Sequence, residues 1–215
     1  MSEYFIPAGD GEAEFVEKRS SFLGHVRFVE TEDAAREFIN EMKKKHYDAR
    51  HNCWCYIIRG GAVRYSDDGE PQGTAGLPML EVFKREGIEN VVCVVTRYFG
   101  GVLLGTGGLL RAYTKSAKDA LTAAGIAAVR RWVKAELTAP YSLLERMKLE
   151  CVAHDGVVQD VEYGADVTLR LLLPEAKAED FFARVTELSA GACTPHRTGD
   201  EFMAAPLTVA GNPLF

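Results

Sequence analysis

Long apolar runs are missing from this sequence of 215 residues: no stretch approaches the roughly 20 consecutive apolar residues that a membrane-spanning helix needs. The first residues contain neither a basic cluster nor an apolar segment, so they do not resemble a secretory signal. Cysteine is scarce, and five residues at irregular spacing favour free thiols in a reducing compartment over a disulfide framework. We therefore expect a cytoplasmic protein with no membrane partner.

Positive charge is also in short supply. The chain has 25 Lys and Arg against 31 Asp and Glu, a formal net charge of −6, which argues against nucleic-acid binding through bulk charge and against DNA specificity. The deficit is uneven, because residues 1–133 hold 18 basic and 18 acidic side chains, whereas residues 134–215 hold 7 and 13. We predict two domains, 1–133 and 134–205, followed by a C-terminal tail at 206–215.

The second domain has a regular alternation of short elements. Its first segment alternates apolar and polar residues with the period of a half-buried strand, and Gly164-Ala165-Asp166 joins two β-rich runs as a hairpin. The expected strands and helices lie at 133–139, 143–151, 157–163, 167–173, 181–188 and 193–203. This β-α-β-β-α-β order predicts a ferredoxin-like fold.

The first domain also mixes helices and strands, so the fold class is α+β. Thr31 is a candidate N-cap for a helix whose apolar face is Ala35, Phe38, Ile39 and Met42. The other elements are expected at 22–29, 53–58, 63–66, around 80–83, 91–95 and 109–124. The run at 91–95 is apolar throughout, which is typical of a strand that is buried on both faces.

Glycine is concentrated between the last expected strand of the first domain and its final helix. Such glycines let backbone amides converge on a ligand, and a helix N-terminus adds about half a positive charge, so the segment predicts a site for phosphate or another anion. No acidic residue lies between Arg97 and Lys118. The predicted anion- or RNA-binding residues are Arg97, Gly100, Gly101, Gly105, Thr106, Gly107, Gly108, Arg111 and Lys115. Alternatively, the glycines only let backbone approach backbone in a tight loop.

A second unusual loop carries three carboxylates within four residues. They could hold a hard cation such as Mg²⁺ or meet a positively charged partner; alternatively, the loop is an exposed turn in which Asp and Gly serve backbone roles. With a neighbouring histidine, the possible loop site consists of His51, Asp67, Asp68, Gly69 and Glu70. His51 is a candidate acid or base, but no nucleophile motif accompanies it, so we assign no catalytic residue.

The cysteines do not predict a metal site. Cys53 and Cys55 form a C-x-C pair, whereas structural zinc sites commonly use paired C-x₂₋₄-C units, and Cys93 lies in an apolar run. Buried structural cysteine is the favoured interpretation. We expect no metal ligands and no cofactor.

Three ordered blocks resemble a known family. They are His51-Asn52-Cys53-Trp54, Ser66–Pro71 with Gly73–Gly76, and Arg97–Gly101 continuing to Leu104–Leu109. Through these blocks the sequence resembles the IMPACT/YigZ family. The resemblance implies a first domain like ribosomal protein S5 domain 2 and a second domain like domains III and V of elongation factor G. It also implies a link to translation, because eukaryotic relatives regulate initiation through a partner that activates an initiation-factor kinase.

Two functions fit these observations. The first is a non-enzymatic, translation-related regulator that binds RNA, the ribosome or a translation-factor protein through the glycine-rich segment and the adjacent basic helix. The alternative is a small-molecule enzyme of phosphoryl transfer or hydrolysis. It would hold phosphate in the glycine-rich segment and Mg²⁺ in the loop of Asp67, Asp68 and Glu70.

Overall fold

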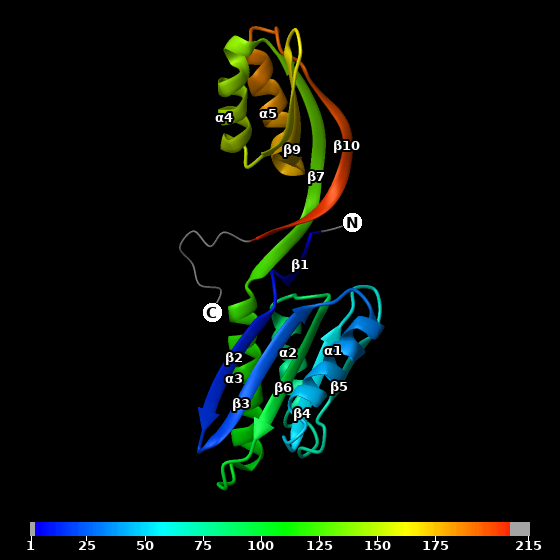
Figure 1. Ribbon diagram of the computed structural model, residues 1–215, viewed down its shortest axis with the longest axis vertical. Helices are drawn as coiled ribbons and strands as arrows, with labels where there is room; N and C mark the ends of the chain where they lie inside the picture. Colours follow the sequence, from blue (N-terminus) through cyan, green and yellow to red (C-terminus); the bar gives the residue numbers. More distant parts are fainter. Residues whose placement is uncertain (1–2, 207–215) are drawn as a thin grey trace. The chain divides into compact units, whose positions relative to one another are not determined.

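The computed structural model describes residues 3–206 and divides into two compact units, Tyr4–Ala128 and Val129–Met203 (Figure 1). The division falls between Ala128 and Val129, five residues before the expected 133/134 boundary, and strand β7 (Ile126–Ala139) runs through both positions without interruption. The expected tail, apart from Pro206, lies outside the described residues. No helix in the described part of the chain is long and apolar enough to cross a membrane.

The N-terminal unit is built on an antiparallel sheet of five strands in the order β2-β3-β6-β4-β5. The strands are β2 (Gly11–Glu17), β3 (Ser20–Phe28), β4 (His51–Ile57), β5 (Val63–Ser66) and β6 (Val91–Tyr98). The β4–β5 hairpin and the buried strand β6 were predicted, whereas β2 and the short β1 (Tyr4–Pro7) were not. Strand β6 is buried from Val91 through Arg97, so helices must cover both faces of the sheet.

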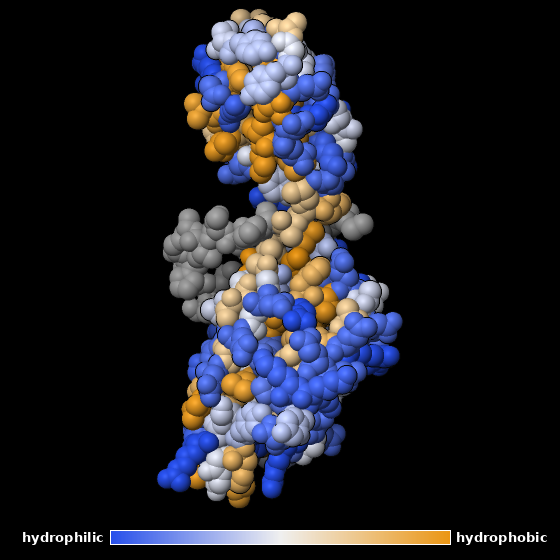
Figure 2. Space-filling view, viewed as in Figure 1, coloured by the Kyte–Doolittle hydropathy of each residue, from blue (hydrophilic) through white to orange (hydrophobic). Residues whose placement is uncertain are grey.

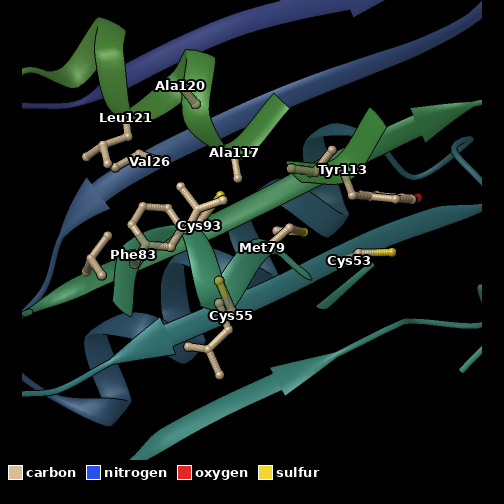
Figure 3. Close-up of a cluster of buried hydrophobic side chains, with 14 of the residues drawn as sticks. Val26, Cys53, Cys55, Met79, Phe83, Cys93, Tyr113, Ala117, Ala120 and Leu121 are labelled. Carbon is tan, nitrogen blue, oxygen red and sulfur yellow. The ribbon is translucent and has the colours of Figure 1, made fainter. Parts of the chain in front are cut away.

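Three helices provide this cover. Helix α1 (Glu32–Lys45) begins at the predicted cap, where the Thr31 hydroxyl accepts from the amide of Ala34 at 3.1 Å. Its predicted apolar residues are all buried: Ala35, Phe38, Ile39 and Met42. Helices α2 (Gly76–Arg85) and α3 (Gly105–Ala124) share the opposite face and enclose the larger core. Figure 3 shows Ala117 and Tyr113 of α3 within this core.

Helix α3 begins four residues earlier than the predicted start at Leu109. Three of the glycines that were predicted to form a loop, Gly105, Gly107 and Gly108, are therefore part of its first turn. Glycine is tolerated there because the first amides of a helix have no hydrogen-bond partner within the helix, so few intrahelical hydrogen bonds depend on these residues. The loop that remains between β6 and α3 spans residues 99–104.

The C-terminal unit has the predicted β-α-β-β-α-β order. It consists of β7, a 3₁₀ turn (Tyr141–Leu143) leading into α4 (Leu144–Ala153), β8 (Val157–Tyr163), β9 (Val167–Pro174), α5 (Glu175–Leu188) and β10 (Pro195–Pro206). Strand β9 pairs antiparallel with β7 and β8, and β10 pairs with β7. The helices bury Met147 and Phe181 against this sheet. The α+β class with a ferredoxin-like second domain is confirmed.

Candidate functional site

The glycine-rich segment combines the two roles that the sequence left open. A Cβ at Gly100 would lie 2.1 Å from the backbone of Arg19, so this glycine allows the loop to pack against the turn between β2 and β3. Its amide also donates to Ser20 Oγ at 3.2 Å. Gly101 and Gly105 face open space but have φ angles of +84° and +72°, which L side chains rarely adopt. Gly100 therefore serves the close approach of two backbone segments, and a Cβ at Gly108 would lie 2.9 Å from the Leu104 side chain.

The first turn of α3 has unpaired amides at the surface. Leu104 at the N-cap makes no capping hydrogen bond, and Gly105, Thr106 and Gly107 are exposed. Within the described residues, no carbonyl or side chain accepts from the amides of these three residues. The amides and the helix dipole therefore remain available to an anion, and the anion site stays a prediction.

A cavity of about 300 Å³ adjoins this turn. Its walls come from β2, from the β2–β3 turn and from α3, and they consist of Phe15, Glu17, Lys18, Leu104, Gly108, Arg111, Ala112 and Lys115. Figure 1 shows that the β2–β3 turn and the start of α3 lie at the same end of the unit. The cavity thus brings cations from two distant parts of the sequence together with the helix N-terminus.

The cations of the cavity differ in how far they are neutralised. Lys115 Nζ lies 2.7 Å from Asp119 Oδ2 and 5.2 Å from the centre of the Phe15 ring, so much of its charge is already balanced. Arg111 is exposed, and no carboxylate of the described residues pairs with it. Lys18 is likewise exposed and unpaired with any carboxylate of the described residues, so Arg111 and Lys18 are the cavity cations available to a ligand.

Sequence analysis missed Lys18. It belongs with Arg19 to the tight β2–β3 turn, where the two residues have φ angles of +46° and +67°. The position of this turn beside α3 depends on strand β2, which was not predicted. The only sign of this turn in the sequence is a pair of basic residues between two segments that contain alternating apolar residues.

Arg97 is not part of this surface, which corrects the prediction. Its side chain is 7% exposed and its Nη1 lies 2.7 Å from Glu70 Oε1, on a side chain that is 3% exposed. The hydroxyl of Tyr113 donates to the same oxygen at 2.8 Å. Removing a charge from water is costly unless it is paired, so Arg97 and Glu70 serve each other rather than a ligand.

The other two carboxylates of the second loop also have internal partners. The Asp67 carboxylate accepts hydrogen bonds from the backbone amides of Gly73, Ala75 and Gly76 at 2.8, 3.0 and 2.9 Å. It thus caps the N-terminus of α2 from outside the helix. Asp68 accepts from Lys43 Nζ at 2.7 Å, and its second carboxylate oxygen accepts from a backbone amide at 2.8 Å. The carboxylates therefore serve backbone and side-chain partners of the fold, but the turn is not exposed as expected, because Asp67 and Asp68 are half-buried and Glu70 is buried.

His51 and Gly69 belong to the same network. The Nδ1 atom of His51 lies 2.9 Å from the carbonyl oxygen of Asp68, and Gly69 has a φ angle of +87° beside the imidazole. The carboxylates of Asp67, Asp68 and Glu70 bind different partners, and the described residues contain no group of three side chains arranged to hold a metal. The Mg²⁺ interpretation of this loop is not supported.

The thiol nearest to this network is inactive as a nucleophile. Cys53 is fully buried, and its Sγ donates to the carbonyl of Asp67 at 3.0 Å. Burial raises the pKa of Cys53 far above the usual range, so the thiol stays protonated. Cys55 is also buried, and desolvation likewise raises its pKa. Both residues are structural, as predicted.

A histidine cluster on the α1 side of the sheet was not predicted. His25 of β3 and His46 at the end of α1 have ring centres 5.5 Å apart, and His46 Nδ1 lies 3.0 Å from the Tyr98 hydroxyl. That hydroxyl donates to Asp48 at 3.0 Å. Burial lowers the pKa of both histidines below the usual 6.5, assisted by the nearby Lys45 ammonium. The two histidines are distant in sequence, so no local motif announces them.

These features define a two-domain α+β protein that presents a cationic cavity on its first domain. Residues 18–121 match the Impact N-terminal domain, and residues 137–192 match a domain of unknown function (DUF1949).

Whole-chain comparisons extend this match. The chain is 37% identical over 193 residues to the IMPACT family member YvyE of Bacillus subtilis (strain 168), which covers 89% of each protein. It is 34% identical over 197 residues to YigZ of Escherichia coli (strain K12), across 89% of this chain and 96% of that protein. A crystal structure of a hypothetical protein aligns with a TM-score of 0.58 and 32% identity, over 93% of this chain and 98% of that one. The chain therefore belongs to the IMPACT family.

Proposed function

We propose that the protein is a non-enzymatic, translation-related regulator of the cytoplasm that binds RNA, free or in the ribosome, through one surface of its first domain. This surface, called the α3 surface, consists of Lys18, Gly105, Thr106, Gly107, Arg111 and Lys115. The observation that carries the proposal is Arg111, an exposed cation without a carboxylate partner among the described residues, beside the open amides of the α3 N-terminus.

RNA phosphate fits the chemistry of this surface. Backbone amides at a helix N-terminus and an arginine guanidinium are both donors that phosphate oxygens accept readily. The net charge of −6 makes binding depend on this local patch rather than on the whole molecule. The link to translation rests on the family resemblance, which implies that eukaryotic relatives regulate initiation. A translation-factor protein is the other partner class that the resemblance allows.

An enzymatic function has less support. Phosphoryl transfer would require carboxylates placed to hold Mg²⁺ near the bound phosphate. The carboxylates of Asp67, Asp68 and Glu70 instead bind α2 amides, Lys43 and Arg97. No observation favours the enzyme, so we propose only the binding function.

Charge reversal at Arg111 tests the proposal. We expect Arg111→Glu to reduce the affinity for RNA or ribosomes by tenfold or more, measured by co-sedimentation and by binding to a labelled RNA. The slope of log affinity against log salt concentration should become shallower by about 0.7 for each phosphate contact that is lost.

The matched control is Lys177→Glu, because Lys177 is an exposed residue of α5 and the substitution changes the net charge equally. Position 177 also lies in the first turns of its helix, where an acidic residue is tolerated. Equal affinity of Arg111→Glu and Lys177→Glu for RNA and ribosomes would refute the proposal.

A further inference from the structure

Three apolar side chains project from the loop between β6 and α3. Phe99, Val102 and Leu103 are 42%, 41% and 83% exposed. We call these three residues the loop tip. Single exposed apolar residues are common on protein surfaces, but three within five positions form a group, and grouped apolar side chains mark interaction sites.

The loop tip lies directly beside the α3 surface. Gly100 follows Phe99 and packs against the backbone of Arg19 in the β2–β3 turn. Leu104 follows Leu103 and lines the cavity that also contains Lys18 and Arg111. Figure 2 shows hydrophobic and hydrophilic side chains next to each other at this lower end of the N-terminal unit.

The surroundings of the loop tip indicate the chemistry of its partner. The cations around the loop tip are Lys18 and Arg19 of the β2–β3 turn and Arg111 and Lys115 of α3, whereas the nearby carboxylates are Glu17 and Asp119. A partner that fits this surface therefore offers apolar faces beside anionic groups. Nucleic acid has this composition, because the flat base faces are apolar and the phosphates carry the charge.

The exposed apolar loop tip also favours single-stranded over double-stranded RNA. In a duplex the base faces are stacked inside, where a protruding loop cannot contact them, whereas unpaired RNA leaves base faces accessible. We propose that the loop tip packs against unstacked bases of single-stranded RNA while the α3 surface holds the adjoining phosphates. This inference rests on the proposed function and narrows its ligand to unpaired RNA.

Two variants separate the base contact from the phosphate contact. Binding is measured by fluorescence anisotropy with a labelled single-stranded oligoribonucleotide and with the same strand annealed to its complement. We expect Leu103→Ser to weaken binding of the single strand roughly tenfold, with an unchanged salt slope and an unchanged affinity for the duplex. Arg111→Gln should weaken binding of both forms and make the salt slope shallower.

Leu149→Ser is the matched control, because Leu149 is a 71% exposed leucine on α4. The inference is overturned if Leu103→Ser leaves single-strand binding unchanged, or lowers single-strand and duplex binding equally. It is also overturned if Leu103→Ser lowers ribosome co-sedimentation but not binding of the naked strand, since the loop tip would then contact protein. If the unmodified protein binds neither RNA nor ribosomes, the proposed function itself fails.

Discussion

Removal of the Arg97 charge is the most informative test of the internal network. Arg97 and Glu70 form an ion pair at 2.7 Å in which both side chains are almost fully buried, and Tyr113 is the second partner of the Glu70 oxygen. In Arg97→Met, Glu70 would remain buried with one hydrogen bond and no counter-charge. Breaking a buried pair from one side costs about 3–5 kcal/mol, and we expect a loss of that size in the free energy of unfolding.

The measurement is urea unfolding followed by tryptophan fluorescence. Hydrogen–deuterium exchange at α3 and at residues 66–76 then locates the change in the N-terminal unit. Lys84→Met is the control, because Lys84 pairs with Glu81 at 3.0 Å on the surface, where such a pair contributes about 0–1 kcal/mol.

The double variant Arg97→Met with Glu70→Leu tests whether the unpaired Glu70 carboxylate causes this loss of stability. It should be more stable than Arg97→Met alone, because the uncompensated carboxylate is gone. The reasoning fails if Arg97→Met costs no more than Lys84→Met, or if the double variant is no more stable than the single one.

Two further predictions concern the capping carboxylate and the histidine cluster. Asp67→Ala should lower the free energy of unfolding by about 2 kcal/mol, because three amides at the start of α2 lose their acceptor; an unchanged urea midpoint relative to the exposed-site control Asp10→Ala would contradict this. Burial lowers the pKa of His25 and His46 below 6.5, so the unfolded chain binds more protons in acid. Stability should therefore be complete above the unfolded pKa and fall as the pH drops through 6.5. Thermal unfolding across that range checks this, and His25→Gln should flatten the dependence; identical profiles for both proteins would contradict it.

Elements with a strong local period were predictable from the sequence. The second domain was recognised because its strands alternate apolar and polar residues and its hairpin has a clear turn, so each element could be identified without knowledge of its neighbours. The cap at Thr31 was recognised for the same reason. Strand β2 was missed because the inward positions at its start, Gly11 and Ala13, are small, and its burial against α3 depends on distant contacts.

The placement of the cations could not be predicted, because a count of charges along the sequence does not tell in which direction each side chain points. Arg97 follows Cys93 and Val95 at the period of a strand, and both lie in the core that α3 covers, so its side chain enters that core. The place of Gly105, Gly107 and Gly108 in the first turn of α3 was not predicted, because glycine usually disfavours helix. Asp67 caps a helix that begins nine residues later, which no local rule anticipates.

The β2–β3 turn places two non-glycine residues, Lys18 and Arg19, in the left-handed backbone region. Asn-Gly adopts that conformation with less strain, so a chain selected for rigidity alone would have it there. The double substitution Lys18→Asn with Arg19→Gly should thus raise the free energy of unfolding and, under the proposed function, lower the affinity of the protein for RNA. If the proposed function holds, stabilising this hairpin against heat would therefore weaken RNA binding, because the same two residues carry the strained backbone and the basic side chains.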